Sequence, residues 1–355
     1  MGEMKKISFW NGKKVLVTGH TSFKGSWLCK MLEIVGADVV GYGLQPSTHP
    51  NLHDVSDLDI HSINGDIRDF DSLLATFERV RPEVVIHMAA QPLVLDSYRL
   101  PRFTYEVNVM GALNVLECTR LNGGVKSLIN VTTDKVYLNK ERAEGYTEND
   151  ELNGYDPYSN SKSCAELMTS SYNNSFLRDM SVAVSTMRSG NVIGGGDFSA
   201  NRLIPDCARA LARGEVIRIR NPNAVRPYLH VLDTLSVYIK VAEIQYRDIS
   251  FAGAYNIGPA EDECATSAQL ATYFCNTWGD GASWEHVTVE NPHESNMLKL
   301  DCSKAKNILK WTPRWNIEKA VEETVLWYKA YFSGKAVKEV MVKQIGDFFI
   351  GEVWN

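Results

Sequence analysis

The fold of this chain is decided by the stretch Val15-Leu16-Val17-Thr18-Gly19-His20-Thr21-Ser22-Phe23-Lys24-Gly25. Its first residues form a short apolar run, which is typical of a buried parallel strand. Apolar side chains then recur at helical spacing through 26–35. A strand, a glycine turn and a helix in this order predict a dinucleotide site, because glycines let backbone N–H groups approach a pyrophosphate at the helix N-terminus. An ordinary turn is the alternative, and a second apolar strand at 38–42 favours the dinucleotide interpretation.

Strands and helices alternate along the first half of the chain. We expect strands at 14–19, 38–43, 60–66, 84–88, 127–132 and 181–187, and helices at 24–36, 69–79, 104–121 and 157–178. This pattern predicts an α/β fold with a doubly wound parallel Rossmann sheet, whose ligands lie beyond the carboxyl ends of the strands. The elements after about 190 are shorter and mixed, which predicts a smaller C-terminal substrate-binding lobe. The Rossmann domain would then span 1–190 and be rejoined by about 229–258, and the lobe would comprise 191–228 and 259–355.

The composition is that of an ordinary globular protein of 355 residues, 44% hydrophobic and 23% charged. The net charge of −6 is opposite to the basic face that a nucleic-acid-binding protein carries. No apolar run reaches the ~20 residues that span a bilayer, and the polar N-terminus does not resemble a secretory signal. Seven cysteines without a Cys-x-x-Cys spacing favour free thiols in a reducing cytosol. We therefore expect a cytoplasmic protein that binds no nucleic acid, membrane or metal.

Catalytic chemistry is indicated by Tyr158-Ser-Asn-Ser-Lys162, which follows the Val131-Thr132-Thr133 strand end. Tyr158 and Lys162 are one helical turn apart, so both side chains face one way. The Lys162 ammonium and a nicotinamide cation would lower the pKa of the phenol, which could then take a hydroxyl proton as hydride leaves. Thr133 would hydrogen-bond the reacting oxygen. A solvated helix face is the alternative for such a pair.

Asp134-Lys135 adds a second chemistry to this strand end. Simple oxidation does not need an adjacent acid and base, whereas elimination of water from a transiently oxidised sugar does. One proton transfer from Lys135 to Asp134 would give an acid for a leaving hydroxyl and a base for an acidified C–H. The alternative is a solvated turn pair without a catalytic role.

Other polar residues occupy the expected ligand edge. The candidate cofactor ligands, besides Tyr158 and Lys162, are Gly19, Thr21, Ser22, Phe23, Lys24, Gly25, Asp66, Ile67, Ala89, Ala90, Gln91 and Asn108. Asn108 is either exposed to solvent or a polar brace, and we favour the brace. Guanidinium groups suit a diphosphate, and we expect one or two of five arginines to bind one. These arginines are Arg188, Arg202, Arg218, Arg220 and Arg226.

These segments resemble the extended short-chain dehydrogenase/reductases, and within them the CDP-glucose 4,6-dehydratases. The resemblance covers nearly the whole chain and includes Gly-His-Thr-x-Phe-Lys-Gly at 19–25, Gly-Asp-Ile-Arg-Asp at 65–69, His-Met-Ala-Ala-Gln-Pro-Leu-Val at 87–94, Asn-Val-Met-Gly at 108–111, Thr-Asp-Lys at 133–135, Tyr-Asp-Pro-Tyr-Ser-Asn-Ser-Lys at 155–162, Gly-Asn-Val-Ile-Gly-Gly-Gly-Asp at 190–197, Ile-Arg-Asn-Pro at 219–222 and Leu-Lys-Leu-Asp-Cys-Ser-Lys-Ala at 298–305. The Asp-Lys pair marks this subfamily, because related dehydratases carry Asp-Glu there. Asn191 and His293 are expected on the substrate side.

The resemblance implies a tightly bound NAD and a CDP-hexose substrate. Hydride would leave C4, water would be lost across C5–C6, and hydride would return to C6, giving a CDP-4-keto-6-deoxy sugar for lipopolysaccharide O-antigen. It also implies a homodimer joined through the helices at 104–121 and 157–178. The second strand has no terminal Asp or Glu for the ribose, so the choice of NAD over NADP rests on the resemblance.

Several positions depart from the family pattern. Ser22 replaces the middle glycine, where its Cβ could crowd a pyrophosphate or its hydroxyl could bind one. The substrate-side departures are Leu95-Asp96, Tyr228-Leu229 and the segment Asn291 to Met297. They leave open which hexose and which base are bound. They also leave open an epimerase or reductase on the same scaffold, a dehydratase for another nucleotide sugar, and a weakly catalytic binding protein.

Overall fold

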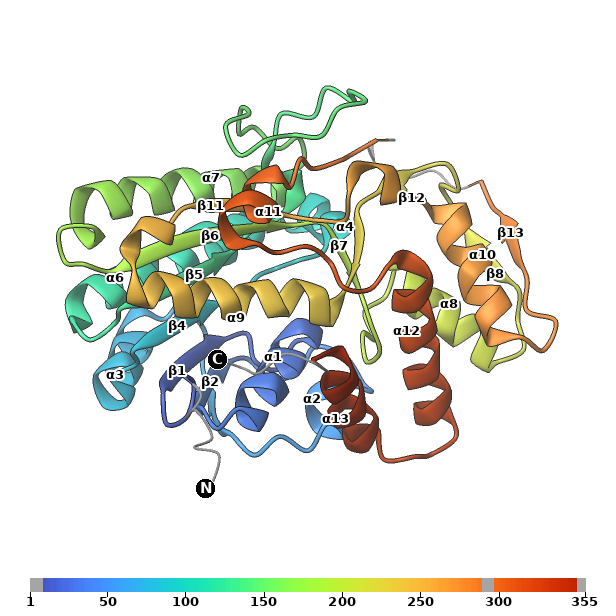
Figure 1. Ribbon diagram of the computed structural model, residues 1–355, viewed down its shortest axis with the longest axis horizontal. Helices are drawn as coiled ribbons and strands as arrows, with labels where there is room; N and C mark the ends of the chain where they lie inside the picture. The colour runs from blue at the N-terminus through green and yellow to red at the C-terminus, as the bar shows by residue number, and fades with distance from the viewer. Residues whose placement is uncertain (1–8, 289–296, 350–355) are drawn as a thin grey trace, which may run out of the picture.

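A computed structural model of the protein describes residues 9–288 and 297–349 (Figure 1). Its centre is a seven-stranded parallel sheet in the order β11-β6-β5-β4-β1-β2-β3. The strands are β1 Lys14–Thr18, β2 Asp38–Gly43, β3 His61–Asn64, β4 Val84–His87, β5 Ser127–Val131, β6 Ala183–Ser189 and β11 Ala254–Ile257. The doubly wound parallel sheet predicted from the sequence is confirmed, with strand bounds that differ from the expected ones by a few residues.

Both faces of the sheet are covered because side chains alternate along each strand. Val15 and Val17 of β1 pack in one apolar core with α1 (Phe23–Ile34) and α9 (Val231–Arg247). Leu16, between them, points into a second core with α3 (Phe70–Val80) and α6 (Ala112–Asn122). α7 (Pro157–Tyr172) lies beside α6 on this second face (Figure 1). The two cores fix the sheet from both sides and leave its carboxyl edge for ligands.

The helices are more broken than the sequence suggests. The expected helix at 104–121 consists of α5 (Pro101–Tyr105), a π-helical segment at Glu106–Gly111, and α6. α7 similarly continues into a π-helical segment at Asn173–Leu177. The short helices α2 (Leu52–Val55) and α4 (Val94–Arg99) were not anticipated, because neither is long enough to show a hydrophobic period.

The chain leaves the sheet after β6 and returns to it later. β7 (Asn191–Ile193) pairs with β10 (Tyr228–His230), α9 then crosses the sheet, and β11 joins its edge beside β6. The smaller part contains α8 (Leu203–Ala212), β8 (Ile217–Ile219), β9 (Val225–Arg226), β12 (Ala265–Thr266), α10 (Ser267–Trp278), β13 (Trp284–His286) and α12 (Ile317–Phe332).

The predicted division of the chain into two domains stays a prediction. α11 (Ser303–Leu309) packs on β11 and α13 (Val337–Phe348) packs on α1, although both belong to the segment expected in the smaller lobe. The glycine-rich loop after β7 is held where the two parts meet. Trp27 donates its indole N–H to the carbonyl of Gly195 at 2.9 Å, and a Cβ on Gly195 would lie 2.0 Å from the Trp327 ring.

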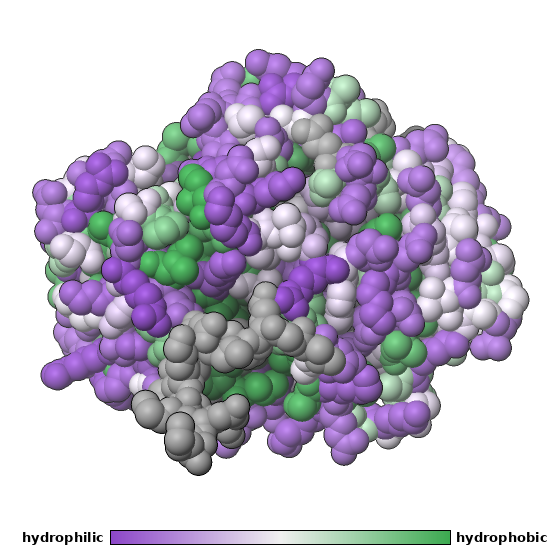
Figure 2. Space-filling model, viewed as in Figure 1, coloured by the Kyte–Doolittle hydropathy of each residue, from purple (hydrophilic) through white to green (hydrophobic). Residues whose placement is uncertain are grey.

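The face seen in Figure 2 is mainly hydrophilic, as expected for a globular protein. All seven cysteines are free thiols. Within residues 9–288 and 297–349, no helix has the length and apolar character needed to cross a bilayer.

Candidate active site

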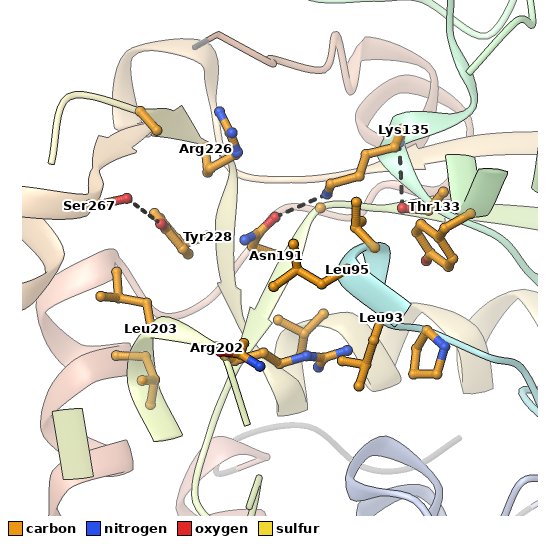
Figure 3. Close-up of a pocket in the computed structure, with 18 of the residues that line it drawn as sticks. Leu93, Leu95, Thr133, Lys135, Asn191, Arg202, Leu203, Arg226, Tyr228 and Ser267 are labelled. Carbon is orange, nitrogen blue, oxygen red and sulfur yellow. Dashed lines mark hydrogen bonds between the residues drawn. The ribbon is translucent and has the colours of Figure 1, made fainter. Parts of the chain in front are cut away.

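A cavity of about 440 Å³ opens at the carboxyl edge of the sheet, between the sheet and the smaller part (Figure 3). Thr133 and Lys135 after β5, and Tyr158 of α7, line one side of it. Arg202, Arg218, Arg220 and Arg226 come from the smaller part. The residues expected for hydride transfer and those expected for a diphosphate therefore share one space.

Thr133, Asp134 and Lys135 form a hydrogen-bonded group in which the side chains of Thr133 and Lys135 both contact that of Asp134. Thr133 Oγ1 donates to Asp134 Oδ1 at 2.9 Å, and Lys135 Nζ donates to the same oxygen at 3.0 Å. Asp134 is fully buried, and its Oδ2 has no hydrogen-bond partner in the described part of the chain. An unpartnered carboxylate oxygen is costly to bury, so Oδ2 is available for a hydrogen bond with a bound ligand.

Tyr158 is placed by the start of α7. Asp156 caps the helix by accepting the N–H of Ser159 at 3.0 Å, and Pro157 occupies the first turn, where its missing N–H costs nothing. Tyr158 thus lies in the first turn, close to the end of β5. Burial raises the pKa of Tyr158 to about 12, and the Asp134 charge adds to this, whereas a hydrogen bond with Thr133 lowers it.

Lys162 lies one turn further along α7. Its Nζ donates to the carbonyl of Val131 at 3.1 Å, which ties the helix to the end of β5. Burial lowers the pKa of Lys162 to about 8, against the raising effect of Glu166. In the protein without bound cofactor, burial of the phenol is the largest effect on the pKa of Tyr158, and the predicted lowering by Lys162 and a nicotinamide stays a prediction.

The glycine turn between β1 and α1 is tight. Gly19 has a φ of +75°, and a Cβ there would lie 2.7 Å from the backbone nitrogen of Ala89. A Cβ on Gly25 would lie 2.2 Å from the carbonyl of Gly19. Ser22 caps α1, because its Oγ accepts the N–H of Gly25 at 3.1 Å and donates to the Gly19 carbonyl at 2.8 Å. The Ser22 hydroxyl is therefore engaged within the loop.

The other expected cofactor ligands lie at the same edge, and several contact protein groups. Arg68 holds the Asp66 carboxylate, with Nη2 2.6 Å from Oδ2, and lowers its pKa. The side chain of Ile67 is buried against Gly111. Asn108 bonds both backbone groups of Gln91, accepting its N–H at 2.8 Å and donating to its carbonyl at 3.1 Å.

Four of the five candidate arginines line the cavity, and the fifth, Arg188, does not. Arg202 and Arg220 line the cavity with Arg218 and Arg226. Arg202 Nη1 lies 3.3 Å from Asp197 Oδ2, while Arg218 is three-quarters exposed and pairs with Glu285. Arg188 was wrongly included among the diphosphate candidates. It is buried away from the cavity in an ion pair with Glu166 at 2.8 Å, because its side chain points from β6 towards α7, which carries Glu166.

Figure 3 shows two opposite walls of the cavity. Lys135 Nζ meets Asn191 Oδ1 at 3.4 Å on one side, and Tyr228 and Ser267 lie together on the other, with their hydroxyls 3.4 Å apart. Lys24 also lines the cavity; burial, together with the charges of Arg202 and Lys162, lowers its pKa to about 7. His293 and most of the departures at 291–297 lie outside the described residues.

Comparison with known proteins agrees with this geometry. A family model described as GDP-mannose 4,6 dehydratase matches residues 16–324. The chain belongs to the GDP-mannose 4,6-dehydratase family. It is 44% identical over 349 residues to the CDP-glucose 4,6-dehydratase of Salmonella typhimurium, which covers 96% of this chain and 97% of that protein.

Solved structures support the family fold. The UDP-glucose 4-epimerase of Thermus thermophilus, solved in complex with NAD, is 24% identical with a TM-score of 0.77 and covers 89% of this chain and 98% of its own. The dTDP-glucose 4,6-dehydratase DesIV of Streptomyces venezuelae, solved with NAD, is also 24% identical, with a TM-score of 0.76 and coverages of 90% and 98%. At these identities the likeness concerns the fold alone.

The sequence did not indicate several of the residues that line the cavity. These cavity residues come from three parts of the chain, and their local sequence does not indicate a cavity: Leu93 before α4, Asn139 and Glu141 in the loop between β5 and α7, and Ser267 at the start of α10. Glu166 was also missed, although its signal was available. It continues the one-turn spacing of Tyr158 and Lys162 along α7.

Proposed function

We propose that this protein is an NAD-dependent CDP-D-glucose 4,6-dehydratase. The observation that carries the proposal is the grouping of Thr133, Asp134 and Lys135 beside Tyr158 in one cavity. The near full-length similarity to a CDP-glucose 4,6-dehydratase favours a CDP-hexose substrate and a 4-keto-6-deoxy product. The substrate-side departures affect the choice of hexose more than the reaction.

The residues of the glycine turn fit a dinucleotide. Gly19 and Gly25 keep the turn so close that no Cβ is accommodated, and α1 begins directly at the turn, so its N-terminus is the end that a pyrophosphate would approach. Ser22 fits as well, because its hydroxyl caps α1 instead of occupying the phosphate position. NAD bound here would supply the hydride acceptor for C4 and the hydride donor for C6. Asn108 would act indirectly, by holding Gln91 in place.

Tyr158 is the proposed base for the C4 hydroxyl. A phenol whose pKa is about 12 in the protein alone is a weak base, and a nearby nicotinamide cation would lower that pKa. Thr133 would hold the reacting oxygen within reach of Tyr158. Lys162 keeps a positive charge beside this pair, and its bond to Val131 fixes the distance between α7 and β5.

Asp134 and Lys135 are the proposed elimination pair. Once C4 is a ketone, the C5 proton is acidic, and a neutral Lys135 amine can remove it. The Asp134–Lys135 contact of 3.0 Å allows the internal proton transfer that creates this amine and a protonated carboxyl. Because Lys135 lines the cavity while Asp134 is fully buried, we propose that Asp134 delivers its proton to the C6 hydroxyl only after a side-chain rearrangement or through Lys135.

The diphosphate is proposed to lie along the arginine wall, with Arg202 and Arg226 as its main ligands. Asn191 would contact the hexose, because it already contacts Lys135 at the catalytic end. Tyr228 and Ser267 would lie near the base. His293 is kept as a substrate ligand on the strength of the resemblance.

The test is to incubate the purified protein with CDP-glucose, dTDP-glucose, UDP-glucose and GDP-mannose. Mass spectrometry should show loss of one water from CDP-glucose and a product carrying a 4-ketone. A product of unchanged mass would indicate an epimerase, whereas a reductase would give no product, because none of these nucleotide sugars carries a free carbonyl group. Protein that consumes added NAD stoichiometrically would contradict a tightly bound, internally recycled cofactor.

We also propose a homodimer that acts in the cytoplasm in O-antigen sugar synthesis. α6 and α7 lie side by side at one side of the molecule (Figure 1), and exposed apolar side chains occur on these helices and on the π-helical segments that adjoin them. They include Met110, Leu121, Leu167 and Phe176. Light scattering should give twice the 39.8 kDa chain mass, and Leu167→Lys should return it to a monomer.

A further inference from the structure

Glu166 lies one turn after Lys162 on α7 and is buried. Its carboxylate accepts three hydrogen bonds. Thr132 Oγ1 donates to Oε1 at 2.5 Å, while Thr186 Oγ1 and Arg188 Nη2 each donate to Oε2 at 2.8 Å. A buried charge with this many partners is strongly held in one geometry.

The bond from Thr132 places Glu166 next to the proposed chemistry. Lys162 bonds the carbonyl of Val131 and Glu166 bonds the side chain of Thr132, so two successive residues at the end of β5 are tied to α7. The next residues along the chain are Thr133, Asp134 and Lys135. Any movement of α7 relative to β5 would change the distance between Tyr158 and this group.

Arg188 extends the same network to the loop that borders the cavity. Its Nη1 donates to Tyr137 Oη and to the carbonyl of Glu148, both at 3.0 Å. Tyr137 and Glu148 belong to the segment 137–152, in which Asn139 and Glu141 line the cavity. The Glu166–Arg188 pair therefore connects α7, the ends of β5 and β6, and this loop.

We propose that Glu166 is a positioning residue, which locks the acid–base strand end to α7 and supplies the negative charge that faces Lys162. The proposal rests on the proposed function, since it assigns Lys162 and Tyr158 to hydride removal. Glu166 has no contact with the cavity and acts through Thr132 and Lys162.

The charged groups around Lys162 determine the direction in which removal of Glu166 would shift the pKa of Lys162. Glu166 raises the pKa of Lys162, whereas burial lowers it. Lys24 on α1 and His87 on β4 also face Lys162, and each of their pKa values is lowered by burial and by the Lys162 charge. Asp134 after β5 and Tyr158 on α7 complete the surroundings. Loss of the Glu166 charge leaves Lys162 easier to deprotonate.

The first measurement needs no substrate. Lysine labelled with ¹³C at Cε is titrated by NMR in the purified protein, and the Lys162 resonance is identified by its absence in Lys162→Met. In Glu166→Gln its midpoint should fall by about one pH unit. Glu166→Asp, which keeps the charge, should restore most of that shift. The matched control is Glu243→Gln, which removes the partner of Arg247 on α9, far from the cavity, and should leave the midpoint unchanged.

The second measurement is the rate of NAD reduction on mixing with CDP-glucose, followed as a function of pH. Glu166→Gln should lower this rate by about 10-fold at pH 9 and move its alkaline limb about one unit lower, with little change in KM. An unchanged midpoint and limb in folded Glu166→Gln overturn the proposal, because a merely structural role would lower stability without moving either.

A variant that does not fold and a failure of the proposed function each give a different result from a failure of the Glu166 proposal. If Glu166→Gln does not fold because Arg188 is left buried without its partner, the double variant Glu166→Gln/Arg188→Gln replaces it, and the same downward shift is required. If the wild type reduces no NAD with any sugar nucleotide, the proposed function fails, and the NMR titration still decides the role of Glu166.

Discussion

The two ends of the cavity are built differently. At the catalytic end, Asp134 and Lys162 are buried and bonded to neighbouring groups along two adjacent elements. At the nucleotide end, arginines reach in from separate short elements, with Arg218 on β8, Arg226 on β9 and Arg202 at the start of α8, and Arg218 remains mostly exposed. The first arrangement fixes distances between reacting groups, and the second presents charge to a ligand that brings its own diphosphate. We expect changes at the catalytic end to lower kcat and changes at the nucleotide end to raise KM.

The largest effect is expected for Tyr158→Phe. The change removes the proposed proton acceptor with almost no change in volume, so kcat should fall by about 10³–10⁴-fold while substrate binding persists. Stopped-flow absorbance of NADH and calorimetry with the sugar nucleotide measure the two quantities. Near wild-type turnover would remove Tyr158 from the mechanism.

Asp134→Asn and Lys135→Met should block the elimination of water, which follows oxidation at C4. Asn cannot deliver the acid proton and Met cannot take one, so dehydration should slow by about 10²–10³-fold. Oxidation at C4 should persist, and NADH absorbance should appear on mixing and decay slowly. Undiminished formation of the 4-keto-6-deoxy product would make the pair structural. If a variant fails to bind substrate, Lys135→Arg tests the same step with the charge retained.

Arg202→Gln tests the nucleotide end. A charged hydrogen bond to a diphosphate contributes about 1.5–3 kcal/mol, which corresponds to a KM about 10–100-fold higher. The kcat at saturation should stay close to that of the wild type, because Arg202 is not among the proposed proton-transfer groups. A large fall in kcat with unchanged KM would contradict the division between the two ends.

The pH dependence of hydride removal should distinguish the catalytic end of the cavity from the nucleotide end without any mutation. The pKa of Lys162 is lowered to about 8, so its ammonium is lost as pH rises through that value, and hydride removal should fall about tenfold by pH 9. Arginine does not titrate in this range, so the arginine wall stays charged. An oxidation rate that still rises from pH 8 to pH 9 would exclude a role for protonated Lys162.

The smallest effect is expected for Arg218→Gln. Its side chain is 75% exposed and already paired with Glu285, and exposed ion pairs contribute little. KM for CDP-glucose should change by less than about threefold. A larger change would show that Arg218 turns from Glu285 to the ligand on binding.

The sequence predicted the catalytic end better than the nucleotide end. Tyr158 and Lys162 lie on α7, and Thr133 and Asp134 follow the end of β5. The period of a helix and the end of a strand are enough to place them together. Ser267 and Leu93 lie at the starts of α10 and α4, and the position of these helix starts at the cavity depends on packing between distant segments. The interpretation of Arg188 as a candidate diphosphate ligand failed for a related reason. A strand-end arginine is equally compatible with a ligand or a buried ion pair, and its partner Glu166 is distant in sequence.

The position of β11 has a consequence for synthesis of the chain. During translation, β6 is complete once Ser189 has emerged, but the strand that covers its outer edge comes only with Ala254–Ile257. Until then β6 presents unpaired backbone groups, which are a template for association with another chain. Fragments that end before 254 should therefore aggregate, and a nascent chain stalled between β6 and β11 should depend on chaperones more than the finished protein does.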